Sequence, residues 1–417
     1  MKLLPKFGVE FHQAQLKNGA NVFLFKRKGM PIYLRAIFFA GSRFDNIPGT
    51  AHFLEHMLVA GTEKFPTKNL IAEYIQKVGG DFGASTNNTF LRFNIEIPEA
   101  IDMPVGIEVM TECLTRSIFN ARTIETERGS ILSELNAKKT NPNEYLNEVF
   151  SRLAFQDTLL EHSTLGNEVD VQSITRDMLI DFGNKHLHLG NVSFIVSGDV
   201  EIDYLTQLLD SISLPIGKKN AAINQLSFKK ILDQDIEFYP GVKQLQVMFG
   251  CHTPIESYKE YCALRLLNQV LASGRGSRLV TKLRYESGLV YSVFGSILRS
   301  LDWGQYRIRF SCNKDNFEKA KQMIVNEFNK LQAENITETE FQNAKSKISK
   351  GTIRDFQTSD SWINSHEVES LSSPNDVHTI EDYIHTIEML TLEDISSVIN
   401  KYLHEENFYT AICGDYR

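Results

Sequence analysis

The chain has 417 residues, 42% of them hydrophobic, and a formal net charge of −8, so it is long enough for two domains of about 100 to 200 residues each. The acidic balance leaves no basic stripe for nucleic acid, and the five cysteines form no C-x-x-C pair, which predicts reduced core thiols rather than a thiolate metal site or a disulfide framework. Because neither an apolar run of signal-peptide length nor a run of about 18 apolar residues is present, we expect a cytoplasmic protein without a membrane span.

The first elements expected in chain order are strands at 21–25 and 32–39, followed by a helix that begins after the turn residues 46–49. Thr50 is the expected N-cap of this helix, because its hydroxyl can accept one of the first backbone amides. Apolar residues at helical spacing give the helix one buried face, and Gly61 follows its end.

This helix carries two histidines, His52 and His56, four residues apart, with Glu55 beside the second. On a helix of 3.6 residues per turn the two imidazoles project from one face, so both can bind one metal ion while Glu55 points to the same place. The order H-x-x-E-H reverses the commoner H-E-x-x-H, and both orders place a glutamate where it can accept a proton from a metal-bound water. The alternative is two histidines without a ligand on an amphipathic helix, and the complete trio in its helical context favours the metal site.

The next expected elements are a strand that alternates polar and apolar residues, at 90–97, and amphipathic helices at 68–78, 101–118 and 123–139. The last helix carries Glu127 and Glu134, seven residues apart and therefore on one face. A catalytic zinc site usually has three protein ligands, so one carboxylate could be the third ligand while the other orients a histidine. A solvated helix face without a specific role is the alternative, and the residues alone do not exclude it.

The chain repeats itself at an offset of 216 residues, since residues 185–200 align without a gap with residues 401–416. Eight pairs at this offset are identical: Thr175/Thr391, Asn184/Asn400, Lys185/Lys401, Leu187/Leu403, His188/His404, Asn191/Asn407, Gly198/Gly414 and Asp199/Asp415. The repeat predicts two homologous domains of about 200 residues, at 1–216 and 228–417, joined by a polar linker at 217–227.

The second half is expected to contain strands at 244–249, 291–298 and 305–311 and a helix at 315–333. Strands that adjoin long helices, with one face covered, predict an α+β layer in each half. In one alignment of the halves Arg265, Asn268 and Gln269 stand opposite the histidine motif, and at the strict offset Asn268, Leu271 and Ala272 do. Neither set can bind the metal, so the fold itself does not require the motif.

The run Gly-Thr-Ala-His-Phe-Leu-Glu-His-Met at 49–57, with Gly61-Thr62, Gly79-Gly80 and the Glu127/Glu134 pair, closely resembles the inverzincin metallopeptidases of the pitrilysin family. That family includes insulin-degrading enzyme and the mitochondrial processing peptidase, and the likeness spans essentially the whole chain. It implies that His52, His56 and Glu134 bind one zinc ion per chain, that Glu127 supports the site from outside the ligand set, and that Glu55 is the general base.

The resemblance also covers a segment of the second half, 278–291. Its Arg284 and Tyr291, seven residues apart, match a family pair that reaches the zinc site, and a guanidinium and a phenol are suitable donors to an oxyanion. The family further implies an edge strand that binds the substrate backbone. Here that strand contains Phe82, Gly83, Ala84 and Ser85, with Gly83 where family members usually have asparagine, which puts side-chain anchoring at this position in doubt.

The resemblance therefore implies a zinc-dependent endopeptidase acting on peptides or short unfolded polypeptides, with two homologous domains that form half of a four-domain chamber. Such a chain is expected to form a dimer, and a homodimer is the economical choice because both signatures occur in one polypeptide. The alternatives are a heterodimer with a related chain, as in a processing peptidase, and a peptide-binding scaffold without catalysis. A metal-dependent hydrolase acting on small molecules is a weaker alternative, because the edge strand suits a peptide.

Overall fold

The computed structural model describes residues 1–217, 226, 228 and 234–416. These residues form two compact units: Met1–Asn136, His162–Ala222 and Asp355–Val377 in the first, and Ala137–Glu161, Ile223–Arg354 and His378–Arg417 in the second. Apart from Gly217 and Leu226, the predicted linker lies outside the described residues. The predicted domain limits at 1–216 and 228–417 follow internal similarity rather than packing, and they remain a prediction.

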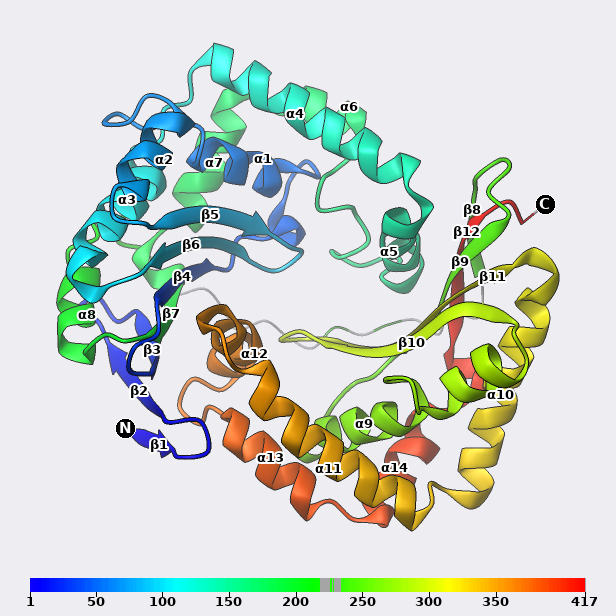
Figure 1. The fold of residues 1–417 in the computed structure, drawn as a ribbon. Coiled ribbons are helices and arrows are strands. Elements are labelled where there is room, and N and C mark those ends of the chain that lie inside the picture. The colour runs from blue at the N-terminus through cyan, green and yellow to red at the C-terminus, as the bar shows by residue number, and fades with distance from the viewer. Residues whose placement is uncertain (218–225, 227, 229–233, 417) are drawn as a thin grey trace. The chain divides into compact units, whose positions relative to one another are not determined.

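The first unit is built on a seven-stranded sheet with the strand order β1-β2-β3-β7-β4-β6-β5. Helices α1, α2, α3 and α7 lie together on one side of this sheet, and α12 lies on the other (Figure 1). Its strands are β1 (Lys2–Leu4), β2 (Val9–Gln15), β3 (Asn21–Lys26), β4 (Ile32–Phe38), β5 (Asp81–Thr86), β6 (Leu91–Ile97) and β7 (Val192–Gly198). Its helices are α1 (Thr50–Leu58), α2 (Lys68–Gln76), α3 (Met103–Thr115), most of α4 (Ala121–Thr140), α6 (Glu168–Ser173), α7 (Arg176–His186), α8 (Ile202–Leu209) and α12 (Ser359–Ser372).

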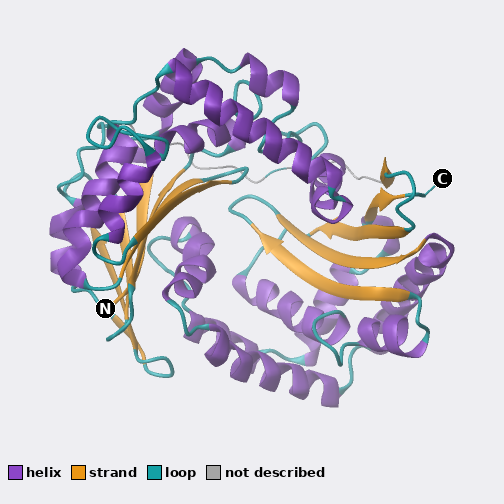
Figure 2. Ribbon diagram, turned by 45° about the horizontal axis from the view of Figure 1, so that its top comes forward, coloured by secondary structure: helices purple, strands orange, loops and turns teal. Residues whose placement is uncertain are grey.

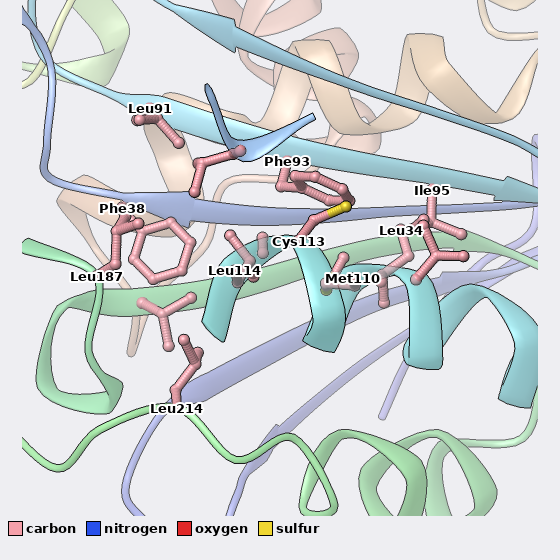
Figure 3. Close-up of a cluster of buried hydrophobic side chains, with 14 of the residues drawn as sticks. Leu34, Phe38, Leu91, Phe93, Ile95, Met110, Cys113, Leu114, Leu187 and Leu214 are labelled. Atoms are coloured by element: carbon pink, nitrogen blue, oxygen red, sulfur yellow. The ribbon is translucent and has the colours of Figure 1, made fainter. Parts of the chain in front are cut away.

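Apolar side chains of α3 and of the central strands fill the core of this unit. The inward residues of β6 alternate with more exposed ones, as the sequence pattern predicts, because successive side chains of a strand face opposite sides. Side chains of β4, β6 and α3 meet in a buried cluster (Figure 3), which includes Leu34, Phe38, Leu91, Phe93, Ile95, Met110, Cys113 and Leu114.

The second unit is built on a five-stranded sheet with the strand order β10-β11-β9-β12-β8. Its strands are β8 (Gln234–Phe238), β9 (Gln244–His252), β10 (Val290–Arg299), β11 (Gly304–Asn313) and β12 (Tyr409–Gly414). Its helices are α5 (Pro142–Ala154), α9 (Tyr258–Leu271), the π-helix η4 (Val280–Glu286), α10 (Phe317–Glu334), α11 (Glu338–Asp355), α13 (Ile380–Met389) and α14 (Leu392–Tyr402).

The two sheets share one topology. The order β5-β6-β4-β7-β3 in the first corresponds to β10-β11-β9-β12-β8 in the second. In each set of five the last pair is parallel, β7 with β3 and β12 with β8, and the other pairs are antiparallel. Figure 2 shows helices packed beside both sheets. The repeat confirms the predicted α+β fold with two similar parts.

The predicted internal match falls on corresponding elements of the two units. Thr175 accepts a hydrogen bond from the Met178 amide at the start of α7, and Thr391 accepts one from the Asp394 amide at the start of α14. Each helix is followed by a central strand, β7 or β12. The strands and helices predicted from residue patterns are all present, and their ends shift by no more than a few residues.

Helix α12 comes from the second half of the chain but packs in the first unit, against β4 and β7. Its Glu367 accepts hydrogen bonds from Arg35 at 2.8 Å and from Arg92 at 2.9 Å. The side chains of Glu367 and Arg35 are only 7% and 8% exposed. Burial alone would raise the pKa of Glu367, but the hydrogen bond and charge of Arg92 and the charge of Arg35 outweigh it and lower the pKa. A buried ionic cluster therefore anchors α12.

Helix α5 comes from the first half of the chain but packs in the second unit, against β8, β9 and β12. Phe150 of α5 stacks on Tyr409 of β12 with ring centroids 5.0 Å apart. Gly250 of β9 makes room for this helix, because a Cβ at that position would lie 2.6 Å from the Phe150 ring. Each unit thus contains one helix from the other half of the sequence, and a cut near residue 216 would leave each sheet without one covering helix.

The cysteines behave as predicted. All five are free and buried: Cys113, Cys251, Cys262, Cys312 and Cys413. Burial raises the pKa of the Cys113 and Cys312 thiols to about 12, so both are neutral at physiological pH. Among the described residues, no helix combines the length and the apolar character needed to cross a lipid bilayer.

Replacing Glu367 by alanine should lower the free energy of unfolding by about 3–5 kcal/mol, because Arg35 and Arg92 would stay buried without a counter-charge. Urea denaturation followed by the fluorescence of the buried Trp362, which lies on the same helix, measures the change. Ser365→Ala, at an exposed position of α12, is the matched control and should leave the midpoint near that of the wild type. Equal midpoints for all three proteins would contradict the anchoring role of Glu367.

Candidate metal centre

Helix α1 carries the histidine motif and starts differently from the prediction. Thr50 is the first helical residue, not the N-cap, so that prediction was wrong. The N-cap is Gly49, which has a left-handed conformation with φ 95°. The chain turns at this glycine, and the Thr50 hydroxyl donates to the Ile47 carbonyl at 2.7 Å instead of accepting a helix amide. A local preference for threonine at N-caps was overridden by the turn that precedes the helix.

The apolar face of α1 fixes the helix on the rest of the first unit. Its buried side chains include Phe53, Leu54, Met57 and Leu58, and the helix contacts β5, β6 and α7. Because side chains one turn apart share a face, His52 and His56 project together from another side of α1. Their rings lie 4.7 Å apart between centroids, at an angle of 77°.

Arg128, next to Glu127 on α4, holds this helix against α1. Its guanidinium lies over the Phe53 ring of α1, 5.1 Å from the centroid. It also donates to the carbonyls of Val171 and Ile174, the latter at 2.9 Å. A planar guanidinium can stack and donate hydrogen bonds at the same time. This contact therefore helps to set the distance between the helix of the histidines and the helix of the carboxylates.

His52, His56 and Glu134 form the one cluster of potential metal ligands found among the described residues. One ligand atom of each lies within 4.8 Å of the others. The Nε2 atoms of His52 and His56 lie 3.7 and 3.9 Å from Oε2 of Glu134. Ligands of a tetrahedral zinc ion, bound at about 2.0–2.2 Å, lie about 3.4 Å apart. The two nitrogen–oxygen distances exceed that spacing by only about half an ångström, and two imidazoles with one carboxylate are ligands that zinc prefers, so the residues fit zinc.

Glu127 contacts the other ring nitrogen of His56. Its Oε2 lies 2.9 Å from Nδ1 of His56. If Nδ1 carries the proton and donates it to this carboxylate, Nε2 presents its lone pair on the side of Glu134. The arrangement fits the assignment of Glu134 as a ligand and of Glu127 as the acid that orients His56, which the spacing of the two glutamates had left open.

Glu55 lies at the same cluster in a largely buried position. Burial raises the pKa of Glu55 above its usual range, and the neighbouring Glu134 adds to the rise, while Thr86 and His56 act against it. The buried hydroxyl of Thr86, on β5, is close enough to Glu55 to lower its pKa, although the geometry falls short of a regular hydrogen bond. A carboxylate whose pKa is raised accepts a proton more readily than an ordinary carboxylate does, as a general base beside a metal cluster requires.

The four residues predicted to bind substrate, Phe82, Gly83, Ala84 and Ser85, lie on β5, which forms one edge of its sheet and contacts α1. Within the described part of the chain β5 pairs only with β6, so its outer edge presents backbone amides and carbonyls. A Cβ at Gly83 would meet no atom within 4 Å. Packing therefore does not explain why this position has a glycine rather than the asparagine that is usual in the resembling family.

Arg284 and Tyr291 lie in the second unit, and their role at the histidine cluster stays a prediction. Arg284 is exposed on η4, and its guanidinium lies 5.8 Å from the ring centroid of Tyr285. Tyr291 is 56% exposed on β10, and its hydroxyl donates to the Asn313 side chain at 3.3 Å. Both side chains present hydrogen-bond donors at the surface of their unit.

Sequence reasoning missed two residues that touch the cluster or its helices, Thr86 and Arg128. Thr86 reaches Glu55 only because β5 pairs with β6 and passes beside α1, which no local pattern indicates. Arg128 occupies a helix face where an arginine is usually a solvated cation. Its position next to Glu127 was the single signal in the sequence.

Two family models match this chain. The model described as insulinase (peptidase family M16) matches residues 34–168, and the model described as peptidase M16 inactive domain matches residues 173–348. An uncharacterized zinc protease of Mycobacterium leprae is 25% identical over 388 residues, which cover 90% of this chain and 85% of that protein. The beta subunit of the mitochondrial-processing peptidase of Bos taurus is 32% identical over 171 residues, 40% of this chain and 34% of that protein.

A solved structure described as a peptidase M16 inactive domain, from Pseudomonas fluorescens, has the same fold. Its TM-score is 0.88, and the match covers 97% of this chain and 98% of that chain. The sequence identity is 22%, so this likeness bears on the fold alone. Together with the sequence matches it accounts for nearly the whole length of the chain.

Replacing Glu127 by glutamine should weaken zinc binding about 10- to 100-fold, because His56 would lose the carboxylate that orients its ring. Competition with a chromogenic chelator measures the zinc dissociation constant. Glu63→Gln removes the same charge at an exposed position outside the cluster, and it should leave the constant unchanged. If both variants shifted the constant equally, the effect would be one of net charge, and the orienting role of Glu127 would be rejected.

Proposed function

Because this chain belongs to the insulinase family, peptidase family M16, we propose that it is a zinc-dependent endopeptidase that hydrolyses peptides or short unfolded polypeptides. The observation that carries this proposal is the convergence of His52, His56 and Glu134 within 4.8 Å at a cluster that also holds Glu55. The relative from Mycobacterium leprae, which spans most of this chain, is named a zinc protease, and this supports the same chemistry here.

In the proposed site His52, His56 and Glu134 hold one zinc ion per chain. A zinc ion held there would lower the pKa of a bound water from about 16 toward about 7 and would polarise the carbonyl group of a peptide bond. Glu55 accepts a proton from the attacking water and returns it to the leaving amine. The upward shift of its pKa favours the first step, because a more basic carboxylate accepts a proton more readily.

Arg284 and Tyr291 donate hydrogen bonds to the carbonyl oxygen as negative charge develops on it. The substrate adds to the free edge of β5 as an extended strand, so that main-chain hydrogen bonds align the scissile bond with Glu55. The contact of β5 with α1 supports this placement, because Thr86 at the end of β5 lies beside Glu55. At Gly83 the substrate peptide would then be bound by the main chain of β5, since glycine has no side chain to contact it.

The working form we propose is a homodimer, because family members of this length hold two of the four homologous domains that enclose a chamber. The motif of the first half and the Arg284/Tyr291 pair of the second occur in one polypeptide, which makes a second kind of chain unnecessary. A heterodimer is the alternative, and the similarity to a subunit of the mitochondrial-processing peptidase favours it.

A second candidate function is a peptide-binding scaffold without catalysis. The description of the matching C-terminal model as an inactive domain favours it, because that domain is a large part of this chain. The complete set of two histidines, a third carboxylate ligand and Glu55 in the first unit argues against it. The two functions differ in whether the wild-type chain hydrolyses peptides at all, and an endopeptidase would need Glu55 for this hydrolysis.

Replacing Glu55 by glutamine should leave zinc binding intact and lower peptide hydrolysis by about 10²- to 10⁴-fold, because the amide cannot accept the proton of the attacking water. Metal content and kcat/KM on a quenched peptide give the two readouts. Glu63→Gln, at an exposed position just after α1, is the control and should keep wild-type activity. Normal hydrolysis by the Glu55→Gln protein would remove Glu55 from the mechanism.

Mixing a Glu55→Gln chain with an Arg284→Ala chain tests whether sites are shared across a dimer. Each homodimer should be nearly inactive, whereas a mixed dimer contains one site with both intact groups if Arg284 serves the neighbouring chain. We expect the mixture to recover up to about one quarter of wild-type activity, since half of the dimers are mixed and one of their two sites is intact. Activity no higher than that of the separate variants would mean that each chain completes its own site.

A further inference from the structure

Helix α1, which carries the two proposed histidine ligands, has no capping side chain at its own N-cap. The N-cap residue is Gly49, and a glycine has no oxygen to accept the first amides of a helix. Thr50, the next residue, has turned its hydroxyl back to the Ile47 carbonyl. The acceptor for the first turn of α1 therefore has to come from another part of the chain.

Asp45 supplies this acceptor from four residues upstream. Its Oδ2 accepts a hydrogen bond from the Gly49 amide at 2.8 Å, and its Oδ1 accepts one from the Ala51 amide at 2.9 Å. Ala51 directly precedes His52 in the first turn of α1. A carboxylate at this place also faces the positive end of the helix dipole, so its charge adds to the two hydrogen bonds.

The surroundings leave no room for an ordinary N-cap residue. A Cβ at Gly49 would lie 2.7 Å from the Leu165 carbonyl oxygen, and a Cβ at Gly166 would collide with the Pro48 carbonyl. The turn before α1 is thus pressed backbone to backbone against residues 165–166. Serine or aspartate therefore cannot take the place of Gly49. The carboxylate of Asp45, which lies outside this tight contact, accepts the helix amides in place of an N-cap side chain.

We propose that Asp45 is a positioning residue of the metal centre, which fixes the first turn of α1 and with it the direction from which His52 approaches the metal. The proposal rests on the proposed function, because it requires that the cluster binds zinc. Asp45 does not touch the ligand side chains in the described contacts, and it acts through the backbone of Ala51. His56, one turn further along α1, depends less on this contact.

The electrostatics of Asp45 also favour a role beyond folding. Burial raises the pKa of Asp45 to about 7, although the hydrogen bonds from Ala51 and Gly49 lower it. Because this pKa is higher in the folded than in the unfolded chain, ionisation of Asp45 lowers the stability of the fold as the pH rises toward 7. Burial thus opposes the charge that the two backbone amides favour, and strongly perturbed groups of this kind concentrate at functional sites.

The test compares Asp45→Ala and Asp45→Asn with Thr175→Ala in the full chain at pH 8. Thr175 caps α7, which packs against α1, so its removal is a matched loss of a helix cap next to the same helix. Two readouts are needed: the zinc dissociation constant from chelator competition, and hydrogen exchange of residues 49–58 in the metal-free protein. Neither depends on peptide hydrolysis.

We expect Asp45→Ala to weaken zinc binding about 10-fold or more and to speed exchange in α1. Asp45→Asn should lie between it and the wild type, because the amide keeps one acceptor oxygen, and Thr175→Ala should leave both readouts unchanged. Wild-type zinc affinity in Asp45→Ala, or an equal loss in Thr175→Ala, would overturn the positioning role while the proposed function stands. A wild-type chain that binds no zinc would reject both proposals together.

Discussion

The candidate site depends on one constraint, the meeting of side chains from α1 and α4 at one place. Two imidazoles on one helix and a carboxylate on another must meet within a few ångströms, and a shift of α1 by one residue would turn the histidines by about 100° away from Glu134. The apolar face of α1 fixes this helix on the core, and the stacking of Arg128 on Phe53 connects α4 to it. The geometry of the cluster is therefore a consequence of the core of the first unit.

The duplication separates what the fold needs from what the chemistry needs. Both sheets have the same order and the same parallel pair, yet the described residues of the second unit hold no cluster of metal ligands. The shared architecture forms without the histidine motif, so His52, Glu55 and His56 are additions to a scaffold that does not depend on them. The two halves of the sequence nevertheless depend on each other for folding, because the sheet of each half is covered in part by a helix from the other half, α12 or α5.

Local patterns predicted the parts of the site that lie within one element. The spacing of His52, Glu55 and His56 follows from the helical period, and so does the shared face of Glu127 and Glu134. Spacing alone did not distinguish the roles of the two glutamates; the resemblance assigned them, and the distances to His56, which are set by tertiary packing, fit that assignment. Local patterns also could not predict that Asp45 caps α1, or that α5 and α12 each pack in the unit formed mainly by the other half of the chain. Each of these features depends on which segments meet in space. Arg284 and Tyr291 still rest on resemblance.

The measurement that tests the central claim most directly is the zinc content of the purified chain together with hydrolysis of a mixed, quenched peptide library, before chelation, after it and after the return of zinc. Our account predicts about one zinc ion per chain, with cleavage that is lost on chelation and restored by zinc. Cleavage that persists after complete removal of the metal, or a chain that takes up no zinc at the cluster of His52, His56 and Glu134, would contradict it.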